Sequence, residues 1–420
     1  MNQEIVDAVH KAITPAEMKD MYYPGMENTE SVAFATYVEN RFQAGLPSKT
    51  FGSSSTIIFN PTEGLGDIAL TLTLPAPSPD ISYAGIGCSE GWGYAAIRQI
   101  GIRIGNSSLY YFTGDELLCA VLSDCEDSEK RDKMLYLGGQ ALLPADFASE
   151  SKRTAYVYIK CPWNSPSAQE KPLALPTDLL TQPVQIIVEF DTANKIFVRA
   201  SGAATGPDGF ASANMQFRQV HMMNGSDLLA RRVDMNSNAL SLPLKYFQQT
   251  TFRTGVTTKN ANEEVQLNLT GFRSGSLKSI DLWATSKDDA TKGNPNRWVL
   301  LGGVKLLVNG LVYYDAPGAS NQFWSIVDRK TDATCAYNYV DASGSTIVGD
   351  NGTLYWLNIP FAQHTEVLAG DNVVSTGLPL MNSVINLSVT FADAGDYILS
   401  AAYNYASNIM FSRGKSCPCA

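Results

Sequence analysis

The chain has 420 residues, of which 45% are hydrophobic and 17% are charged, and its formal net charge is −10. This composition excludes an intrinsically disordered chain, and the length predicts two or three domains. Because no run of lysine and arginine stands out, direct binding to nucleic-acid phosphates is not expected. The 33 glycines and 20 prolines, with 19 tyrosines and 17 phenylalanines, are typical of many strands joined by turns.

Residues 4–13 predict a short amphipathic helix, because Ile5, Val9 and Ile13 recur at helical spacing and Pro15 ends the run. This segment is interpreted either as a packing tail or as an arm that docks on a neighbour or a membrane. Its polar face is not basic, which disfavours a membrane. We expect neither a signal peptide nor a transmembrane span, since no apolar run approaches about 18 residues.

The seven cysteines are an odd number and do not form a dense framework. They favour free thiols in a reducing compartment over a secreted disulfide scaffold. We therefore expect a protein that is made in the cytoplasm. The cysteines are Cys88, Cys119, Cys125, Cys161, Cys335, Cys417 and Cys419.

From about residue 50 the hydrophobic period becomes two, which predicts strands. Leu70, Leu72 and Leu74 share one face of such a strand, with Thr71 and Thr73 on the other. One-sided burial with a polar opposite face is typical of antiparallel sandwiches. Five segments have this alternation: 68–75, 98–105, 184–190, 265–272 and 385–391.

Residues 115–134 are a helical exception to the strand pattern. They begin with an acidic turn and carry opposite charges four residues apart, as in Glu126–Lys130, Asp127–Arg131 and Glu129–Lys133. The pattern predicts one or two exposed helical turns with a solvated charged face.

The second half of the chain repeats the first. Tyr110 and Tyr313 are 203 residues apart, and so are Pro176 and Pro379. Two further segment pairs occur in the same order: 66–76 with 275–284, and 155–163 with 353–361. The repetition predicts two tandem β-domains, each the size of an eight-stranded jelly roll with long loops.

The predicted organisation has four parts. A short N-terminal arm occupies residues 1–49 and the first jelly roll residues 50–227. A linker at 228–245 leads to the second jelly roll and a C-terminal tail at 246–420. The fold class is therefore all-β, with short helices in loops and an N-terminal helix.

Particular motifs of both halves resemble the double jelly-roll major capsid proteins of icosahedral double-stranded DNA viruses. The similarity extends over about residues 55–415 and is to the iridovirus and phycodnavirus kind, or to smaller relatives such as polinton-like viruses and virophages. The chain is short for this family, so we expect reduced surface loops. The motifs are "IRQIGIRIGNSSLYYFTGDELL", "SEKRDKMLYLGG", "YIKCPW", "LALPTDLLTQPVQIIVEF", "VQLNLTGFRSGSLKSIDLWAT", "VKLLVNGLVYYDA", "NIPFAQ" and "SAAYNYASNIMFSRG".

The resemblance implies a structural protein rather than an enzyme, without a cofactor. Three copies would form a homotrimeric capsomer of pseudo-hexagonal outline, and neighbouring trimers would tile the shell of a virion assembled in the host cytoplasm. Penton and minor capsid proteins are implied partners, and an internal membrane could be reached through the N-terminal arm. Direct nucleic-acid binding is not implied.

Gly87-Cys-Ser-Glu-Gly91 fits the nucleophile-elbow pattern of hydrolases and makes Ser89 a candidate nucleophile. That motif needs a buried strand before it, a helix after it and a histidine partner. A turn-rich loop precedes Ser89, and the only histidines are His10, His221 and His364. We therefore assign no catalytic residue.

Cys417 and Cys419 are close in sequence, but no further ligand lies near them, whereas zinc sites usually need four. We interpret this segment as a tail and assign no metal-binding or cofactor-binding residue. No nucleotide-binding glycine motif occurs either.

Five N-x-[ST] sequons occur, and cytoplasmic synthesis argues against their glycosylation. Asn268 and Asn386 lie on the polar faces of predicted strands, whereas Asn106, Asn224 and Asn351 lie in turns. Asn106 is matched by Asn309 in the repeat, which favours a role in shaping a hairpin.

Two alternatives remain open from sequence. One is a binding module, such as a receptor-binding spike or a lectin-like tandem β-sandwich. The other is a twin jelly-roll hydrolase, which would need a cleft with paired carboxylates.

Overall fold

The structure is a computed structural model of the 420-residue chain. The helix predicted at residues 4–13 lies outside the described residues. The structure describes residues 37–59, 64–105, 107–125, 128–161, 175–177, 182–222, 240–247, 251–255, 257–269, 276–317, 334–344, 346–348, 353–361, 378–379, 383–412 and 415–418.

Two antiparallel sheets form a first β-sandwich. One has the order β1 (Tyr37–Gly45), β11 (Ser212–Met222), β3 (Gly64–Thr73) and β7 (Thr154–Ile159), with the short β8 (Leu175–Pro176) also paired to β3. The other has the order β2 (Ser54–Phe59), β9 (Val184–Phe190), β5 (Ile97–Ile104) and β6 (Ser107–Phe112).

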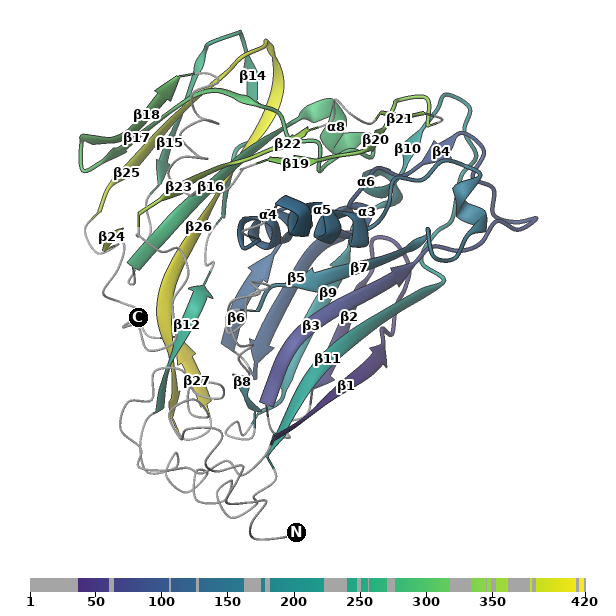
Figure 1. The fold of residues 1–420 in the computed structure, drawn as a ribbon, viewed down its shortest axis with the longest axis horizontal. Coiled ribbons are helices and arrows are strands. Elements are labelled where there is room, and N and C mark those ends of the chain that lie inside the picture. Colours follow the sequence, from purple (N-terminus) through teal and green to yellow (C-terminus); the bar gives the residue numbers. More distant parts are fainter. Residues whose placement is uncertain are drawn as a thin grey trace.

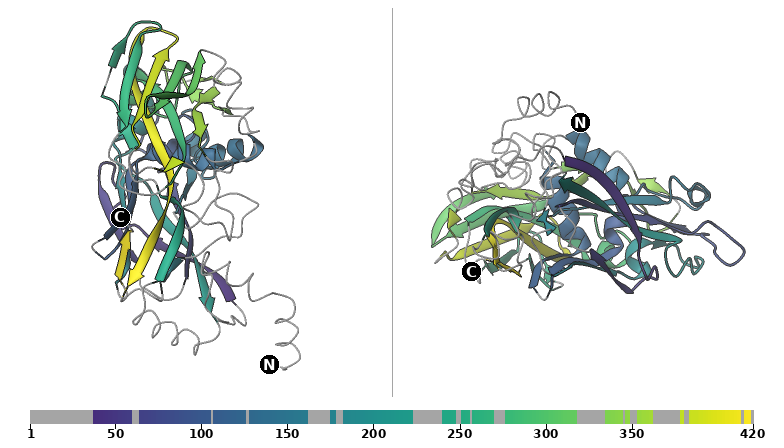
Figure 2. Two further views of the ribbon diagram at one scale, coloured as in Figure 1. Left: turned by 90° about the vertical axis from the view of Figure 1, so that its left-hand side faces the viewer. Right: turned by 90° about the horizontal axis from the view of Figure 1, so that it is seen from below.

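Two further antiparallel sheets form a second β-sandwich. One has the order β12 (Leu240–Phe247), β26 (Gly395–Ser412), β16 (Ser276–Ser286) and β23 (Leu357–Pro360). The other has the order β15 (Glu264–Leu269), β25 (Ile385–Phe391), β17 (Leu301–Val308) and β18 (Leu311–Pro317). The long strand β26 is yellow in Figure 1, and Figure 2 shows it from two further sides. It also pairs with β13 (Thr251–Arg253), β14 (Thr257–Lys259) and β27 (Lys415–Pro418).

The two sandwiches have the same topology. Numbered along the chain within each sandwich, the eight main strands lie in the order 1-8-3-6 in one sheet and 2-7-4-5 in the other. This strand order, in two antiparallel sheets, is the topology of a jelly roll. Even the short strand β8 has a counterpart, because β24 (Leu378–Pro379) pairs with β16 as β8 pairs with β3. The prediction of two tandem eight-stranded jelly rolls is confirmed.

The core of each jelly roll is built from the alternating residues. In β9, Val184, Ile186, Val188 and Phe190 are all at most 1% exposed, whereas the residues between them are half-buried. In β25, Ile385, Leu387, Val389 and Phe391 have the same low exposure. Period-two alternation therefore places one face of each strand between the sheets.

The two β-hairpins that repeat in the sequence have the same strand register. Ile104 pairs with Ser107 and Val308 pairs with Leu311, so both loops have two residues. Asn309 and Gly310 have φ of 51° and 81°, the positive values that a type I′ turn requires. Asn309 and Gly310 therefore form the tight turn of this hairpin.

The strand register corrects the alignment of this repeat by one residue. Ile102 pairs with Tyr110 and Leu306 with Tyr314, so Tyr110 corresponds to Tyr314 rather than to Tyr313. Gly105, with φ of 57°, likewise takes the place of Asn309. The two turns have their asparagine and glycine in opposite order, Gly105-Asn106 and Asn309-Gly310, so matching residue types gives an offset one smaller than the strand register does.

Both jelly rolls begin upstream of the predicted starts at residues 50 and 246. Strand β1 pairs along its whole length with β11, although residues 37–45 fall within the predicted arm. Strand β12 pairs with β26, although residues 240–245 fall within the predicted linker. Strand β1 has no clean apolar–polar alternation. In β12, Leu240, Leu242 and Leu244 do alternate with other residues, but the run contains Pro243, a residue that sheet interiors usually exclude.

Of the two helices in the segment predicted as exposed turns, the first is mostly buried and the second is mostly exposed. Helix α4 (Gly114–Ser123) has a capping box at Thr113, and Leu117, Leu118, Val121 and Leu122 are completely buried. The solvated-face prediction holds for α5 (Ser128–Leu137) at Glu129 and Lys133, which form an exposed ion pair. It is wrong for Arg131, which is 2% exposed. Figure 1 shows α4 and α5 between the two jelly rolls, which explains the burial of α4 and of Arg131.

Candidate functional site

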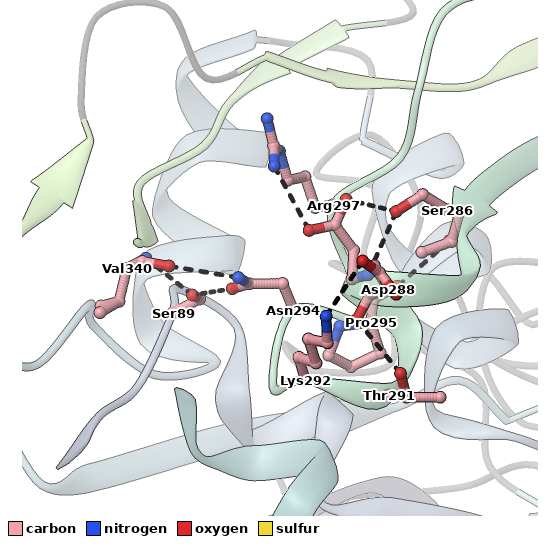
Figure 3. A network of polar contacts seen from close by, with 11 residues as sticks. Ser89, Ser286, Asp288, Thr291, Lys292, Asn294, Pro295, Arg297 and Val340 are labelled. Atoms are coloured by element: carbon pink, nitrogen blue, oxygen red, sulfur yellow. Dashed lines mark hydrogen bonds and ion pairs between the residues drawn. The ribbon is translucent and has the colours of Figure 1, made fainter. Parts of the chain in front are cut away.

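The junction between the two jelly rolls is the most elaborate polar site among the described residues. Ser89 lies between β4 (Ile86–Gly87) and α3 (Trp92–Ala95) of the first jelly roll. Its hydroxyl donates a hydrogen bond to Asn294 Oδ1 and accepts one from Val340 N at 2.9 Å. Asn294 Nδ2 in turn donates to Val340 O at 3.2 Å, and Figure 3 shows this triangle.

The environment of Ser89 is that of a structural contact. The strand–turn–helix order around it is the one that a nucleophile elbow requires, contrary to the sequence interpretation of its surroundings. However, Ser89 is 3% exposed and its hydroxyl is engaged with the second jelly roll as both donor and acceptor. His10 and His364 lie outside the described residues, and only the backbone of His221 is described, in β11.

The second jelly roll contributes a capped helical turn beside this contact. Helix α8 (Lys287–Thr291) begins at Ser286, whose side chain accepts a hydrogen bond from Asp289 N at 3.1 Å. Arg297 Nη1 lies 3.3 Å from Asp289 Oδ1 and Lys292 Nζ lies 3.0 Å from Asp288 Oδ2, as Figure 3 shows. These contacts shape the turn that carries Asn294.

Glu90 makes a second contact across the junction. Its Oε2 accepts hydrogen bonds from Asn338 N at 2.9 Å and Asn338 Nδ2 at 3.0 Å, and its own N–H donates to Asn338 O. Burial raises the pKa of the Glu90 carboxyl, and the nearby charge of Asp132 adds to this, whereas the Asn338 hydrogen bonds lower it. The net pKa is raised, so the folded protein holds the proton more tightly than the unfolded chain.

Replacing Glu90 by Gln is expected to change how stability depends on pH. A raised folded-state pKa contributes stability below the unfolded-state value of about 4.3, and this contribution is lost as pH rises through the folded-state pKa. Gln keeps an oxygen that can accept from Asn338 and does not ionise. The variant should therefore gain stability relative to the wild type as pH rises from 4 to 8, measured by urea unfolding. A pH-independent difference would contradict this assignment.

The N-terminal turn of helix α4 contacts the second jelly roll. Asp115 in this turn forms an ion pair with Arg253 and accepts a hydrogen bond from Trp283 Nε1 at 3.4 Å. Burial lowers the pKa of Arg253, although an arginine stays protonated at neutral pH. Trp283 is 1% exposed and packs on Trp298 with ring centroids 5.5 Å apart. The N-terminal position also suits the Asp115 carboxylate, because the helix dipole is positive there.

The C-terminal end of α4 contacts a buried carboxyl group of the second jelly roll. Asp281 of β16 is 1% exposed and accepts hydrogen bonds from Ser123 Oγ at 3.1 Å and from the side-chain amides of Asn358 and Asn404. Asn404 Nδ2 also donates to Ser279 Oγ at 3.0 Å. Three strands of the second jelly roll and one helix of the first therefore meet at a single carboxyl group.

Helix α5 supplies a third set of contacts. Asp132 Oδ1 accepts hydrogen bonds from Cys335 Sγ at 3.1 Å and Ala336 N at 3.2 Å. Arg131 Nε donates to Cys125 O at 2.9 Å, and its guanidinium lies 5.6 Å from the centre of the Trp356 ring. Burial and the Asp132 contact raise the pKa of the Cys335 thiol, so it stays protonated.

A cavity of about 410 Å³ opens beside these contacts. Its charged lining residues are Arg98, Asp115, Asp191, Lys195 and Arg253. The charges of these side chains largely compensate one another, because Asp115 forms an ion pair with Arg253 and Asp191 attracts Lys195 electrostatically. Within the described ranges, no group of three or more His, Cys, Asp or Glu residues could hold a metal ion.

The other residues singled out in the sequence lie apart from the junction. Asn268 of β15 and Asn386 of β25 are direct cross-strand neighbours, which confirms that both sit in strands. Cys417 lies in β27, while Cys419 and the sequons at Asn106, Asn224 and Asn351 lie outside the described residues. Five cysteines are free and buried, as expected for reduced thiols: Cys88, Cys119, Cys125, Cys161 and Cys335. No helix in the described part of the chain is long and apolar enough to cross a membrane.

Sequence comparisons find no relative of this chain: no model of a known protein family matches it, and no curated protein does. Solved structures do match its fold. The PBCV-1 virus capsid structure has a TM-score of 0.60 at 12% identity, over 94% of this chain and 99% of that chain. The Faustovirus major capsid protein has a TM-score of 0.56 at 10% identity, over 98% and 99% of the two chains.

The Sputnik virophage structure matches with a TM-score of 0.52 at 9% identity, over 94% of this chain and 91% of that chain. Nearly complete coverage in both directions means that both jelly rolls, and their placement side by side, are shared. At such low identities the likeness is one of fold. The chain thus has the double jelly-roll fold of viral major capsid proteins.

Proposed function

We propose that this protein is a major capsid protein, a non-enzymatic subunit of an icosahedral viral shell. One observation carries the proposal: two jelly rolls of identical strand order are joined in one chain by a buried polar junction. The fold likeness to the Faustovirus major capsid protein over nearly the whole of both chains supports it. Rigid joining suits a building block, because a shell needs subunits of fixed shape.

The duplication also supports a homotrimeric capsomer. Three chains with two similar domains each present six similar outer edges, which gives a pseudo-hexagonal outline that can tile a surface. Subunit contacts within such a trimer should be extensive, as obligate interfaces commonly are. Contacts between trimers, with pentons and with minor capsid proteins should be smaller and more polar.

The net charge of −10 fits a shell that surrounds a genome without binding it. In this proposal the protein resides in the virion and is assembled in the host cytoplasm. The N-terminal arm faces inward, toward minor proteins or an internal membrane.

Size-exclusion chromatography with light scattering tests the proposal directly. We expect a particle of three times the 45.5 kDa of one chain, and negative-stain images with three-fold symmetry and a hexagonal outline. A protein that stays monomeric at all concentrations and forms no such particles would contradict the capsid function.

A further inference from the structure

The cavity at the junction takes its walls from both jelly rolls. The first contributes Arg98 of β5 and Lys195 of the short helix α6 (Ala193–Ile196), and the second contributes Arg253 and Asn296. Helix α6 lies against α8, which shortly precedes Asn296 in the chain. The volume of about 410 Å³ is within the usual range of small-molecule pockets, which occur preferentially between domains.

Several polar groups in the cavity wall already have partners within the chain. Asp115 forms its ion pair with Arg253, whose Nε donates a hydrogen bond to Ser400 Oγ at 3.2 Å. Thr285 Oγ1 donates to Pro295 O at 3.3 Å. These contacts hold the walls in place and leave the selection of a ligand to other groups.

Asn296 brings a buried acceptor without a partner to this cavity. The residue is 1% exposed, and its Nδ2 donates to Gly91 O at 3.0 Å. This hydrogen bond fixes the orientation of the amide, because only the nitrogen can donate to a carbonyl oxygen. Asn296 Oδ1 accepts no hydrogen bond. Since buried acceptors are normally satisfied, a donor supplied from the cavity would complete this group.

Two cations that line the cavity lack a counter-ion among the described residues. Lys195 is half-buried, yet its ammonium group forms neither an ion pair nor a hydrogen bond there. Burial lowers the pKa of Lys195, and the more distant charge of Asp191 offsets this only in part. The exposed Arg98 likewise has no ion pair in this part of the chain. Because charges taken out of water are normally paired, both groups favour an anion in the cavity.

The rest of the lining favours an organic anion. Three cationic and two anionic side chains line the cavity, which leaves one net positive charge. Ile97, Ala290 and Ile398 add apolar surface on which a carbon skeleton can pack.

We propose that this cavity binds a small hydroxylated organic anion, either a phosphate ester or a carboxylate. Its anionic group lies at Lys195 and Arg98, and one of its hydroxyl groups donates to Asn296 Oδ1. The bound molecule contacts both jelly rolls and so stabilises their junction. This binding activity is separate from the proposed role in a shell.

Four probes of graded chemistry test the site on the full-length chain. Glucose 6-phosphate and gluconate carry both an anionic group and hydroxyl groups, glucose carries hydroxyl groups alone, and sulfate is an anion without a donor. Isothermal titration calorimetry should show binding of at least one of the first two, and the one that binds identifies the anionic group. Glucose and sulfate should bind at least about ten-fold more weakly. The ligand that binds should also raise the unfolding temperature, because it binds the folded state.

The variant Lys195→Met tests the cationic end of the site. Met keeps a similar length without the charge, so the affinity for the binding probe should fall at least about ten-fold. The matched control is Lys133→Met, because Lys133 is an exposed lysine that does not line the cavity. The control should bind like the wild type.

The comparison of probes on the wild type needs no variant and stays decisive if Lys195→Met does not fold. The inference is overturned if none of the four probes binds, or if glucose or sulfate binds as tightly as the hydroxylated anions. A folded Lys195→Met variant with wild-type affinity would overturn it as well. These results would leave the capsid function standing, since light scattering and imaging test that function independently.

Discussion

Replacing Lys160 by Met is expected to lower the free energy of unfolding by about 3–5 kcal/mol. Lys160 Nζ lies 2.8 Å from Asp124 Oδ1, and the two side chains are only 3% and 6% exposed. Met fills similar volume but leaves the buried Asp124 carboxylate without its counter-charge. Chemical denaturation measures the loss, and a change below about 1 kcal/mol would contradict the buried pair.

Two matched variants separate this effect from loss of packing. The double variant Lys160→Met, Asp124→Asn should recover much of the stability, because no buried charge remains. Lys133→Met removes an ion pair of similar length, 2.6 Å to Glu129, but its side chains are 70% and 72% exposed. That variant should cost no more than about 0.5 kcal/mol.

Replacing Asp281 by Ala is expected to destabilise the protein by about 3–5 kcal/mol and to weaken the coupling of the two jelly rolls. The substitution leaves buried donors from Ser123, Asn358 and Asn404 without their acceptor. Because Ser123 belongs to the first jelly roll, thermal unfolding should also become less cooperative. Calorimetry measures both changes, and an unaltered single transition would contradict the role of this contact.

The variant Asp281→Asn provides a graded control. Its one carbonyl oxygen can still accept from Ser123 and Asn358, which both reach Oδ1. Only the Asn404 contact to Oδ2 is replaced by an amide that cannot accept. The loss of stability should therefore lie between those of wild type and Asp281→Ala.

The alternation of β9 and β25, the Asn309-Gly310 turn and the duplication were predictable from sequence. Each depends on residues that are near in sequence or on a repeated order of segments. The exact correspondence of the hairpins was not, since only the strand register shows that Tyr110 matches Tyr314. Strand β1 was missed because it lacks the alternation, and only its pairing with β11, which is distant in the chain, shows that it is a strand.

The contacts at the junction could not be predicted from the sequence, because the apolar–polar alternation of a strand does not show whether its polar face is solvated or covered by another element. Asp281 lies on the polar side of β16, where one would expect water, yet α4 covers it. Glu90 and Ser89 lie in what reads as a loop, yet both bind the second jelly roll. The only signal in the sequence was the apolar run 117–122, which is too continuous for an exposed helix.

By itself the sequence determined the strand pattern, the turn chemistry and the presence of two similar domains, because side-chain period and backbone preference are local properties. The tertiary structure alone decided which outer faces are covered within the chain and which are left open. Trp356 and Tyr156 occupy equivalent places in similar strands, and only packing of one jelly roll against the other makes them differ. Burial depends on residues distant in sequence, so the surfaces available for assembly are a property of the folded chain.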